Sequence, residues 1–241
     1  MTSPSPAVLA RLCAFGLSLT LLGGCSALRS TTAAPPAFYA LDSARIEGDA
    51  TGRLPATAPP TAPTLIVSPP HAAAGFDSAR IIYVRTAHKL DYFAHGEWVD
   101  TPARMLAPLI VDALGSGGTF RSVILAPTAV AGDLRLDTEI LRLQQDFASQ
   151  PSRVRFTLRA HLVDNTTRRV LAWRVFDESV TAASDDPYGG VVAANRAVQS
   201  VLGQLAGFCA TATAHWQPAA APSRNASRNP RHDGQRMIWR R

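Results

Sequence analysis

Apolar side chains recur along this chain with two distinct spacings. Strict alternation predicts strands over Asp133–Gln144, Arg153–Val163 and Arg169–Val180, because successive side chains of a strand point to opposite faces of a sheet. In the first segment the apolar positions change parity after Ile140, and this change predicts a β-bulge. Asp164–Thr167 is typical of a turn, so the three segments predict an antiparallel meander with one solvated face.

Spacings of three and four residues predict two helices. The first begins at Thr101-Pro102, with the Thr101 hydroxyl as the expected cap, and ends at Gly115. The second begins at Asp186-Pro187 and runs to about Ala214. Its expected buried stripe consists of Val191, Ala194, Val198, Val201, Leu202, Leu205 and Cys209.

Shorter apolar runs predict further strands. These runs are Phe38–Leu41, Thr64–Ser68, Arg80–Arg85, Lys89–Val99 and Ser122–Leu125. Within Lys89–Val99 we expect a turn at Gly96 and a Trp98 side chain that packs inward. The order of these elements predicts an α+β fold, in which two main helices pack on a mixed, largely antiparallel sheet within a single domain.

The first residues are typical of an exported lipoprotein. The apolar run Leu12–Leu22 has about half of the roughly 20 residues that a membrane-spanning helix needs, so it suits a signal peptide. It ends in Leu22-Gly23-Gly24-Cys25, which matches a bacterial lipobox and marks Cys25 as the predicted lipidation site. The alternative is an ordinary cleaved signal with a coincidental cysteine. Because Ser26 follows, and not the aspartate that resembles an inner-membrane retention signal, the outer membrane is favoured.

The chain therefore divides into four expected parts. Residues 1–24 form the signal peptide, 25–37 a tether, 38–216 the folded domain, and 217–241 an Arg-rich tail that we expect to be disordered. Most of the net charge of +6 lies in this tail, so the charge says little about the folded domain. The tail could contact anionic lipid or peptidoglycan, but this is not the favoured interpretation. Lys89 is the single lysine among the 24 basic residues, which we interpret as a coding bias towards arginine and not as a sign of nucleic-acid binding.

The sequence shows no catalytic or cofactor-binding motif, so we predict no enzyme activity, no cofactor and no metal site. His88, Asp91, His95 and Glu97 could be drawn as a metal cluster, but in a strand His88 and His95 fall on opposite faces, which favours solvated edge residues. The glycine-rich residues 115–118 are interpreted as a helix end and not as a phosphate cradle. Cys209 is interpreted as a small buried hydrophobe.

Two groups of side chains have two interpretations each. One face of a single strand carries a basic row, which is either a solvated sheet face or a patch for an acidic partner or lipid headgroups: Arg153, Arg155 and Arg159. An aromatic group belongs either to the core or to a surface for a partner or oligomer: Tyr83, Tyr92, Phe93 and Trp98.

Taken in order, several segments resemble one known family. After the lipobox come FYAL, TLIVSPP, DSARIIYV, LDYFAHGEWVDTPARML, RVLAWRVF and AANRAVQSVLGQL. Over residues 25–215 this series resembles the ABC-type transport auxiliary lipoproteins, a family that includes the Pqi-type outer-membrane lipoproteins. The chain differs from the usual pattern in its Pro-rich stretch at 47–63 and its Arg-rich tail.

The resemblance implies a periplasmic domain held at the outer membrane by acyl chains, such as palmitate, on Cys25. Such domains work with an inner-membrane ABC transporter and a periplasmic protein of the mammalian-cell-entry type, moving phospholipid or other apolar solutes; a homo-oligomer is left open. The predicted function is thus a non-catalytic docking adaptor that maintains envelope integrity. The alternatives are a lipoprotein regulator of a cell-wall synthase and a periplasmic hydrolase that uses His88, Asp91 or His95.

Overall fold

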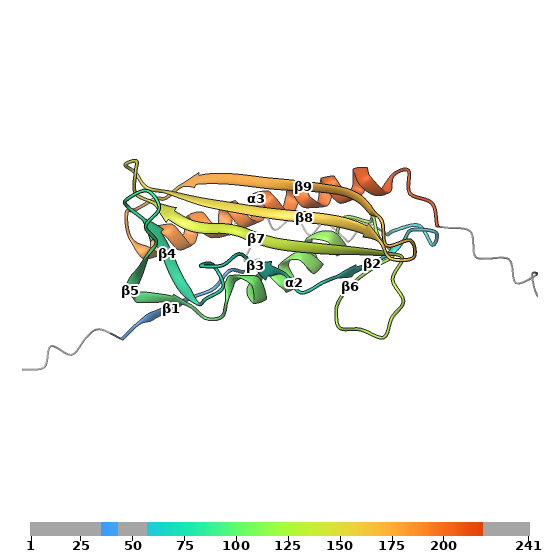
Figure 1. The fold of residues 1–241 in the computed structure, drawn as a ribbon, viewed down its shortest axis with the longest axis horizontal. Helices are drawn as coiled ribbons and strands as arrows, with labels where there is room; N and C mark the ends of the chain where they lie inside the picture. Colours follow the sequence, from blue (N-terminus) through green and yellow to red (C-terminus); the bar gives the residue numbers. More distant parts are fainter. Residues whose placement is uncertain (1–34, 43–56, 219–241) are drawn as a thin grey trace, which may run out of the picture. The chain divides into compact units, whose positions relative to one another are not determined.

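The long strand β7 (Leu134–Asp146) organises the sheet of this computed structural model, which describes residues 35–42 and 57–218. On one side β7 pairs antiparallel with β8 (Arg153–Asp164), and β8 pairs antiparallel with β9 (Val170–Thr181) (Figure 1). The predicted meander is therefore confirmed.

Several predictions concern parts of the chain outside the described residues. These parts include the leader with Cys25 and residues 219–241.

On its other side β7 pairs with three short parallel strands that follow one another along its length. These are β2 (Thr64–Val67), β3 (His71–Ala72) and β4 (Arg80–Val84). Backbone hydrogen bonds continue this pairing between the strands, for example from Ser68 N to the Leu136 carbonyl at 2.9 Å. The two-residue β3 was not predicted.

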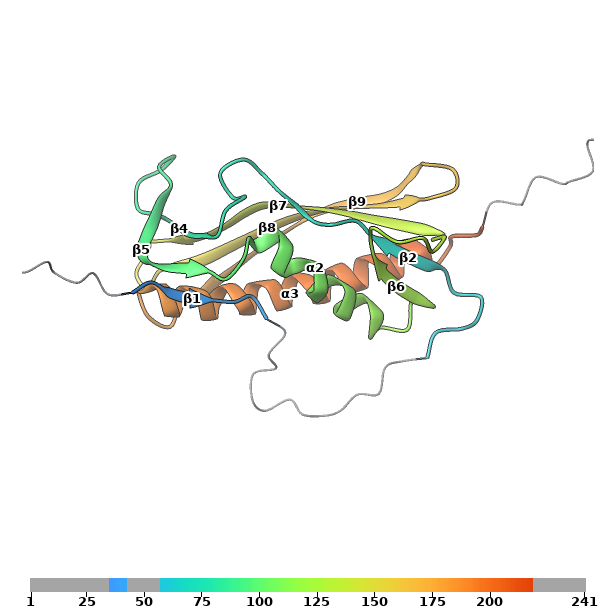
Figure 2. The same cartoon turned by 90° about the horizontal axis from the view of Figure 1, so that it is seen from below.

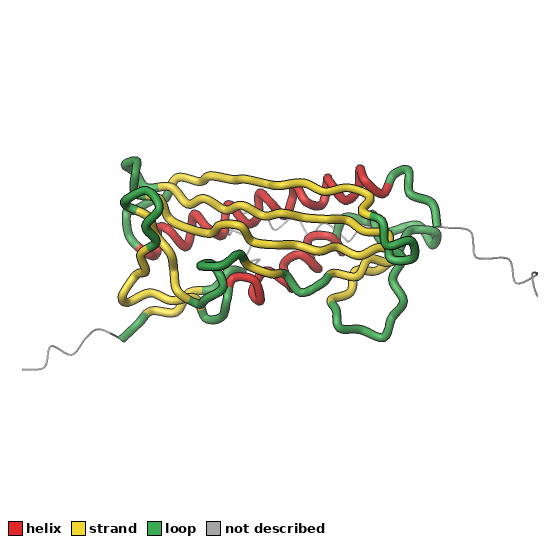
Figure 3. Tube along the Cα trace, in the orientation of Figure 1, coloured by secondary structure: helices red, strands yellow, loops and turns green. Residues whose placement is uncertain are grey.

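Three further strands complete the mixed sheet, which has nine strands among the described residues (Figure 3). β6 (Ser122–Leu125) lies parallel to β2, and β5 (Asp91–Trp98) lies antiparallel to β4. β1 (Ala37–Tyr39) then lies parallel to β5. The longest pairings, β7–β8 and β8–β9, are the antiparallel ones.

Both helices cover the same face of the sheet (Figure 2). α2 (Pro102–Gly115) and α3 (Pro187–Thr213) begin at the predicted prolines, and Asp186 caps α3 by accepting a hydrogen bond from Gly189 N at 2.7 Å. Every residue of the predicted α3 stripe is buried, against Phe156, Leu158 and other inward side chains of the sheet. The predicted α+β class is confirmed. Among the described residues, no helix has the length and apolar character needed to cross a membrane.

Two local predictions were right and two were wrong. The register of β7 shifts between Ile140 and Arg142, as the bulge prediction required, and Trp98 is buried. The turn at Gly96 is wrong, because β5 passes through it without interruption. A Cβ on Gly96 would lie 3.4 Å from Pro187 Cβ, which is an ordinary van der Waals contact, so this glycine is buried beside the start of α3. The Thr101 cap is also wrong: Thr101 occupies the cap position, but its side chain makes no capping hydrogen bond.

Candidate interaction surfaces

The face of the β7–β9 sheet that the helices leave uncovered carries paired charges. Arg155 Nε donates to Asp177 Oδ1 at 3.0 Å, across the β8–β9 pairing. Arg159 Nη1 lies 3.4 Å from Glu139 Oε2, across the β7–β8 pairing. The hydrogen bonds from Arg155 hold the pKa of Asp177 below its usual value. Two of the three arginines of the predicted basic row are therefore matched by acids on neighbouring strands.

Arg153 differs from its two neighbours in the row. Its guanidinium donates to the Ser179 hydroxyl at 3.0 Å and to the Ser179 carbonyl at 3.2 Å, and both acceptors are uncharged. Arg153, Arg155, Asp146 and Asp177 line an open hollow of about 390 Å3 at this end of the sheet. The hollow is lined by both signs of charge, so the face is better described as a solvated, charge-matched surface than as a basic patch.

Strand β9 adds apolar side chains to the same uncovered face. Leu171, Trp173 and Val175 are 39%, 65% and 41% exposed; alternation along the strand places Trp173 and Val175 on one face, and Leu171 precedes them at the register shift of the β8–β9 pair. The Trp173 ring stacks on His161 of β8, with 6.4 Å between the ring centroids. Large apolar side chains in a contiguous exposed row are typical of a contact surface and not of a purely solvated face.

The predicted aromatic group is divided between core and surface. Trp98 lies in the core, whereas Tyr92 is exposed, with the Arg80 guanidinium 5.0 Å from its ring centroid. Tyr83 and Phe93 are half-buried and form a cluster with Phe147 at the end of β7. The centroids in this cluster are 4.6 Å apart for Tyr83–Phe93 and 5.7 Å apart for Tyr83–Phe147. The Arg85 guanidinium covers this cluster, 5.1 Å from the Phe147 centroid.

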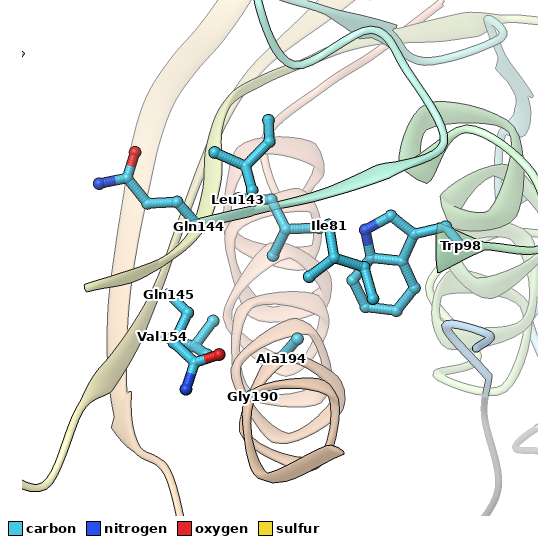
Figure 4. Close-up of a pocket in the computed structure, with 9 residues that line it drawn as sticks. Ile81, Trp98, Leu143, Gln144, Gln145, Val154, Gly190 and Ala194 are labelled. Carbon is cyan, nitrogen blue, oxygen red and sulfur yellow. The ribbon is translucent and has the colours of Figure 1, made fainter. Parts of the chain in front are cut away.

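A small cavity lies between the sheet and the first turns of α3 (Figure 4). Its lining is mostly apolar, from Ile81, Trp98, Leu143 and Val154, with Gln145 as a polar neighbour. The Gln145 amide donates to Ser152 Oγ at 2.8 Å, but its buried Oε1 has no hydrogen-bond partner among the described residues. The cavity volume of about 10 Å3 is the space of about one water molecule. In this conformation it has no room for an acyl chain.

The residues considered for chemistry are not brought together. Within the described ranges, no group of three or more His, Cys, Asp or Glu side chains is arranged to hold a metal ion. Asp91 instead pairs with Lys89 at 3.1 Å, and His88 occupies a loop with a φ of 67°. Cys209 is fully buried, and burial raises the pKa of its thiol to about 12, so it is protonated at neutral pH.

Sequence reasoning missed two of these surfaces. The exposed row on β9 could be found as alternation, but its exposure depends on α3 covering the opposite face of β9. Phe147 follows the end of β7 and joins Tyr83 and Phe93 only through the parallel β4–β7 pairing, which no local pattern indicates.

Comparisons with known proteins agree with the resemblance. A family model described as the ABC-type transport auxiliary lipoprotein component matches residues 47–206. A crystal structure of a Xanthomonas campestris protein is similar with a TM-score of 0.61 and 24% identity, covering 73% of this chain and 95% of that one. An uncharacterized protein is similar with a TM-score of 0.55 and 12% identity, covering 73% and 99%. At these identities the likeness shows the fold alone. No curated protein matches the chain.

Proposed function

We propose a specific role for this chain, which belongs to the ABC-type transport auxiliary lipoprotein component family. In this proposal it is the outer-membrane adaptor of a system that transports lipid or apolar solutes and is linked to a mammalian-cell-entry-type protein. The observation that carries this proposal is the family match over residues 47–206, which extends from the Pro-rich stretch into α3. Family membership establishes that the protein is an auxiliary component of ABC-type transport. The membrane that holds it, its protein partner and the class of molecule transported are proposed.

The anchor in this proposal is Cys25. Its thiol is the nucleophile that can take a diacylglyceryl group, and Leu22-Gly23-Gly24 before it fits the peptidase that would cleave there. Each buried methylene of an acyl chain contributes about 0.8 kcal/mol, and one chain alone binds only marginally. Two or three chains on one cysteine would hold the protein at the bilayer for the lifetime of the cell. Ser26 in the next position favours release to the outer membrane.

The folded domain would then act through its surfaces. The exposed row on β9 and the Arg85-covered aromatic cluster contain aromatic and arginine side chains, which are enriched where proteins contact one another. An adaptor of this kind holds one end of a periplasmic conduit and performs no bond chemistry. The cavity beside α3 has space for about one water, so it is not a binding site for the transported solute in this conformation.

Localisation is tested with two variants of the full-length chain in a Gram-negative host. Cys25→Ala should leave the outer-membrane fraction and fail to maintain the permeability barrier. The matched variant Ser26→Asp keeps the lipid but should accumulate in the inner membrane. A Cys25→Ala protein that still fractionates with the outer membrane would contradict the anchor.

The partner is tested by in vivo crosslinking followed by affinity capture of the acylated chain. We expect a mammalian-cell-entry-type protein or a transporter subunit, lost or reduced in Ser26→Asp because the domain is then at the wrong membrane. Recovery of a penicillin-binding protein in its place would favour regulation of a cell-wall synthase.

A further inference from the structure

The strand β9 forms a long open edge of the sheet. Among the described residues it pairs with β8 alone, and Figure 1 shows it as the outermost strand beyond β7 and β8. The Ala182 amide donates to the Ser152 carbonyl, so even-numbered residues of β9 direct their backbone groups toward β8. The odd-numbered residues from Trp173 to Thr181 therefore direct theirs to the open edge, whereas Leu171 lies at the register shift of the β8–β9 pair. A long edge of this kind is a template for a further strand.

We propose that a second copy of this chain adds its own β9 to this edge, antiparallel, about a two-fold axis at Phe176. The pairing would continue the sheet from one copy into the next. This inference goes beyond the proposed function and does not depend on the anchor, because it rests on the surface of the folded domain alone.

The charged residues of β9 indicate that the added strand is β9 of a second copy, and they favour one register of the pair. In a two-fold antiparallel pair, residues at equal distances on either side of the axis lie opposite each other, and opposed side chains share one face. With the axis at Phe176, Arg174 of each copy lies opposite Glu178 of the other. Both side chains lie on the Phe176 face of the strand, and the Arg174 guanidinium is 5.0 Å from the Phe176 ring centroid. Two opposite-charge pairs form per dimer.

The neighbouring registers are worse. An axis at Arg174 or at Asp177 would place that residue opposite its own copy, with like charges in contact. An axis at Val175 would place Arg174 opposite Phe176 and form no ion pair. The Phe176 register also overlaps the strands from Leu171 to Thr181, which is nearly all of β9.

The exposed apolar row gains cover in the same register. Trp173 would lie opposite Ser179, and Val175 opposite Asp177, so the Trp173 ring would be flanked by a small side chain and not by another bulky one. The Ser179 carbonyl already accepts from Arg153 at 3.2 Å, and a carbonyl oxygen has a second lone pair for the new strand. The row on β9, on the face that α3 leaves uncovered, is thus continuous with the proposed interface between the two copies.

The register is tested with paired cysteines in the full-length chain, crosslinked in the membranes of its host. In Arg174→Cys/Glu178→Cys, the two positions of one copy are about 13 Å apart along the strand, too far for a bond within the chain. We expect most of the protein to migrate at twice its mass without reductant. The matched control Arg174→Cys/Val180→Cys corresponds to the Asp177 axis and should stay largely monomeric. The native Cys209 is buried and serves as the background in both.

A charge exchange provides the second readout. Arg174→Glu alone should weaken association on the order of tenfold, because the introduced carboxylate would face Glu178 of the other copy. Arg174→Glu/Glu178→Arg should restore it. Because Glu178 also accepts hydrogen bonds from Ser200 and Gln204 of its own chain, Glu178→Gln is the control for the loss of that carboxylate. Failure of the exchange to restore association, equal crosslinking of the control pair, or a disulfide to a different protein would each overturn the proposal.

Discussion

Gly190 at the start of α3 provides a stringent test of the packing between this helix and the sheet. A Cβ added there would lie 2.2 Å from Gln145 Oε1 and 2.8 Å from Gln145 Cδ. The Gln145 side chain is buried and is held by Ser152, so it has little freedom to withdraw. Gly190→Ala should therefore destabilise the protein, although alanine is the better helix former.

Two effects of opposite sign determine the magnitude. Overpacking of a well-filled core typically costs about 1–3 kcal/mol. Replacing glycine by alanine inside a helix contributes up to about 1 kcal/mol in the other direction. We expect a net loss of about 1–2 kcal/mol for Gly190→Ala. The matched control is Gly203→Ala in the same helix, where a Cβ would meet nothing within 4 Å. This variant should gain about 0.5–1 kcal/mol.

Urea unfolding of the purified variants, followed by far-UV circular dichroism, measures the difference. With unchanged m-values of about 2 kcal/mol per molar, the midpoint of Gly190→Ala should fall by about 0.5–1 M. Adding Gln145→Ala should reduce the effect of Gly190→Ala, because the clashing atoms are gone. If Gly190→Ala proves as stable as Gly203→Ala, the close contact between Gly190 and Gln145 is not a feature of the folded protein.

Three further predictions concern single side chains. Hydrogen bonds from the Thr167 amide and the Trp216 indole lower the pKa of Asp164, so the stability they give should persist down to about pH 4 and be lost as the pH falls further, through the lowered folded-state pKa. Asp164→Asn should therefore make the fall of the urea midpoint from pH 7 to pH 3 smaller than in the unchanged protein, and an equal fall would contradict this. Asp186→Ala should cost about 0.5–2 kcal/mol by removing the cap of α3, and an unchanged urea midpoint would contradict this. In a Cys13→Ala/Cys25→Ala background, which leaves Cys209 as the single thiol of the sequence, Cys209 should react with a thiol reagent at pH 8 only after unfolding, and rapid labelling of the native protein would refute its burial.

The local elements were predictable because the signals that define them are local. Asp186-Pro187 marks the start of α3 through a side-chain cap and a fixed φ, and both act within one turn. The β7 bulge was visible as a change of apolar parity after Ile140. Gly96 was misjudged because glycine is common in turns but also occurs inside strands, and here it lies within β5, beside Pro187, which is far away in sequence.

Long-range pairing was not predictable. The succession of β2, β3 and β4 along one edge of β7 depends on parallel contacts between distant segments, and β3 has only two residues. The basic row on β8 illustrates the consequence for the site. Arg155 is visible in the sequence, but the Asp177 that neutralises it lies opposite only after the β8–β9 register is formed. The charged residues could therefore be counted from the sequence, but which of them form ion pairs could not be predicted.

The covalent state of Cys25 in the native protein, measured by mass spectrometry of the N-terminal peptide from purified membranes, tests the adaptor account most directly. The account predicts a chain that begins at this cysteine and carries a diacylglyceryl thioether, with or without a further acyl chain on the new amino group. An unmodified thiol, or a mature chain that begins at another residue, would contradict both the anchor and the outer-membrane role built on it.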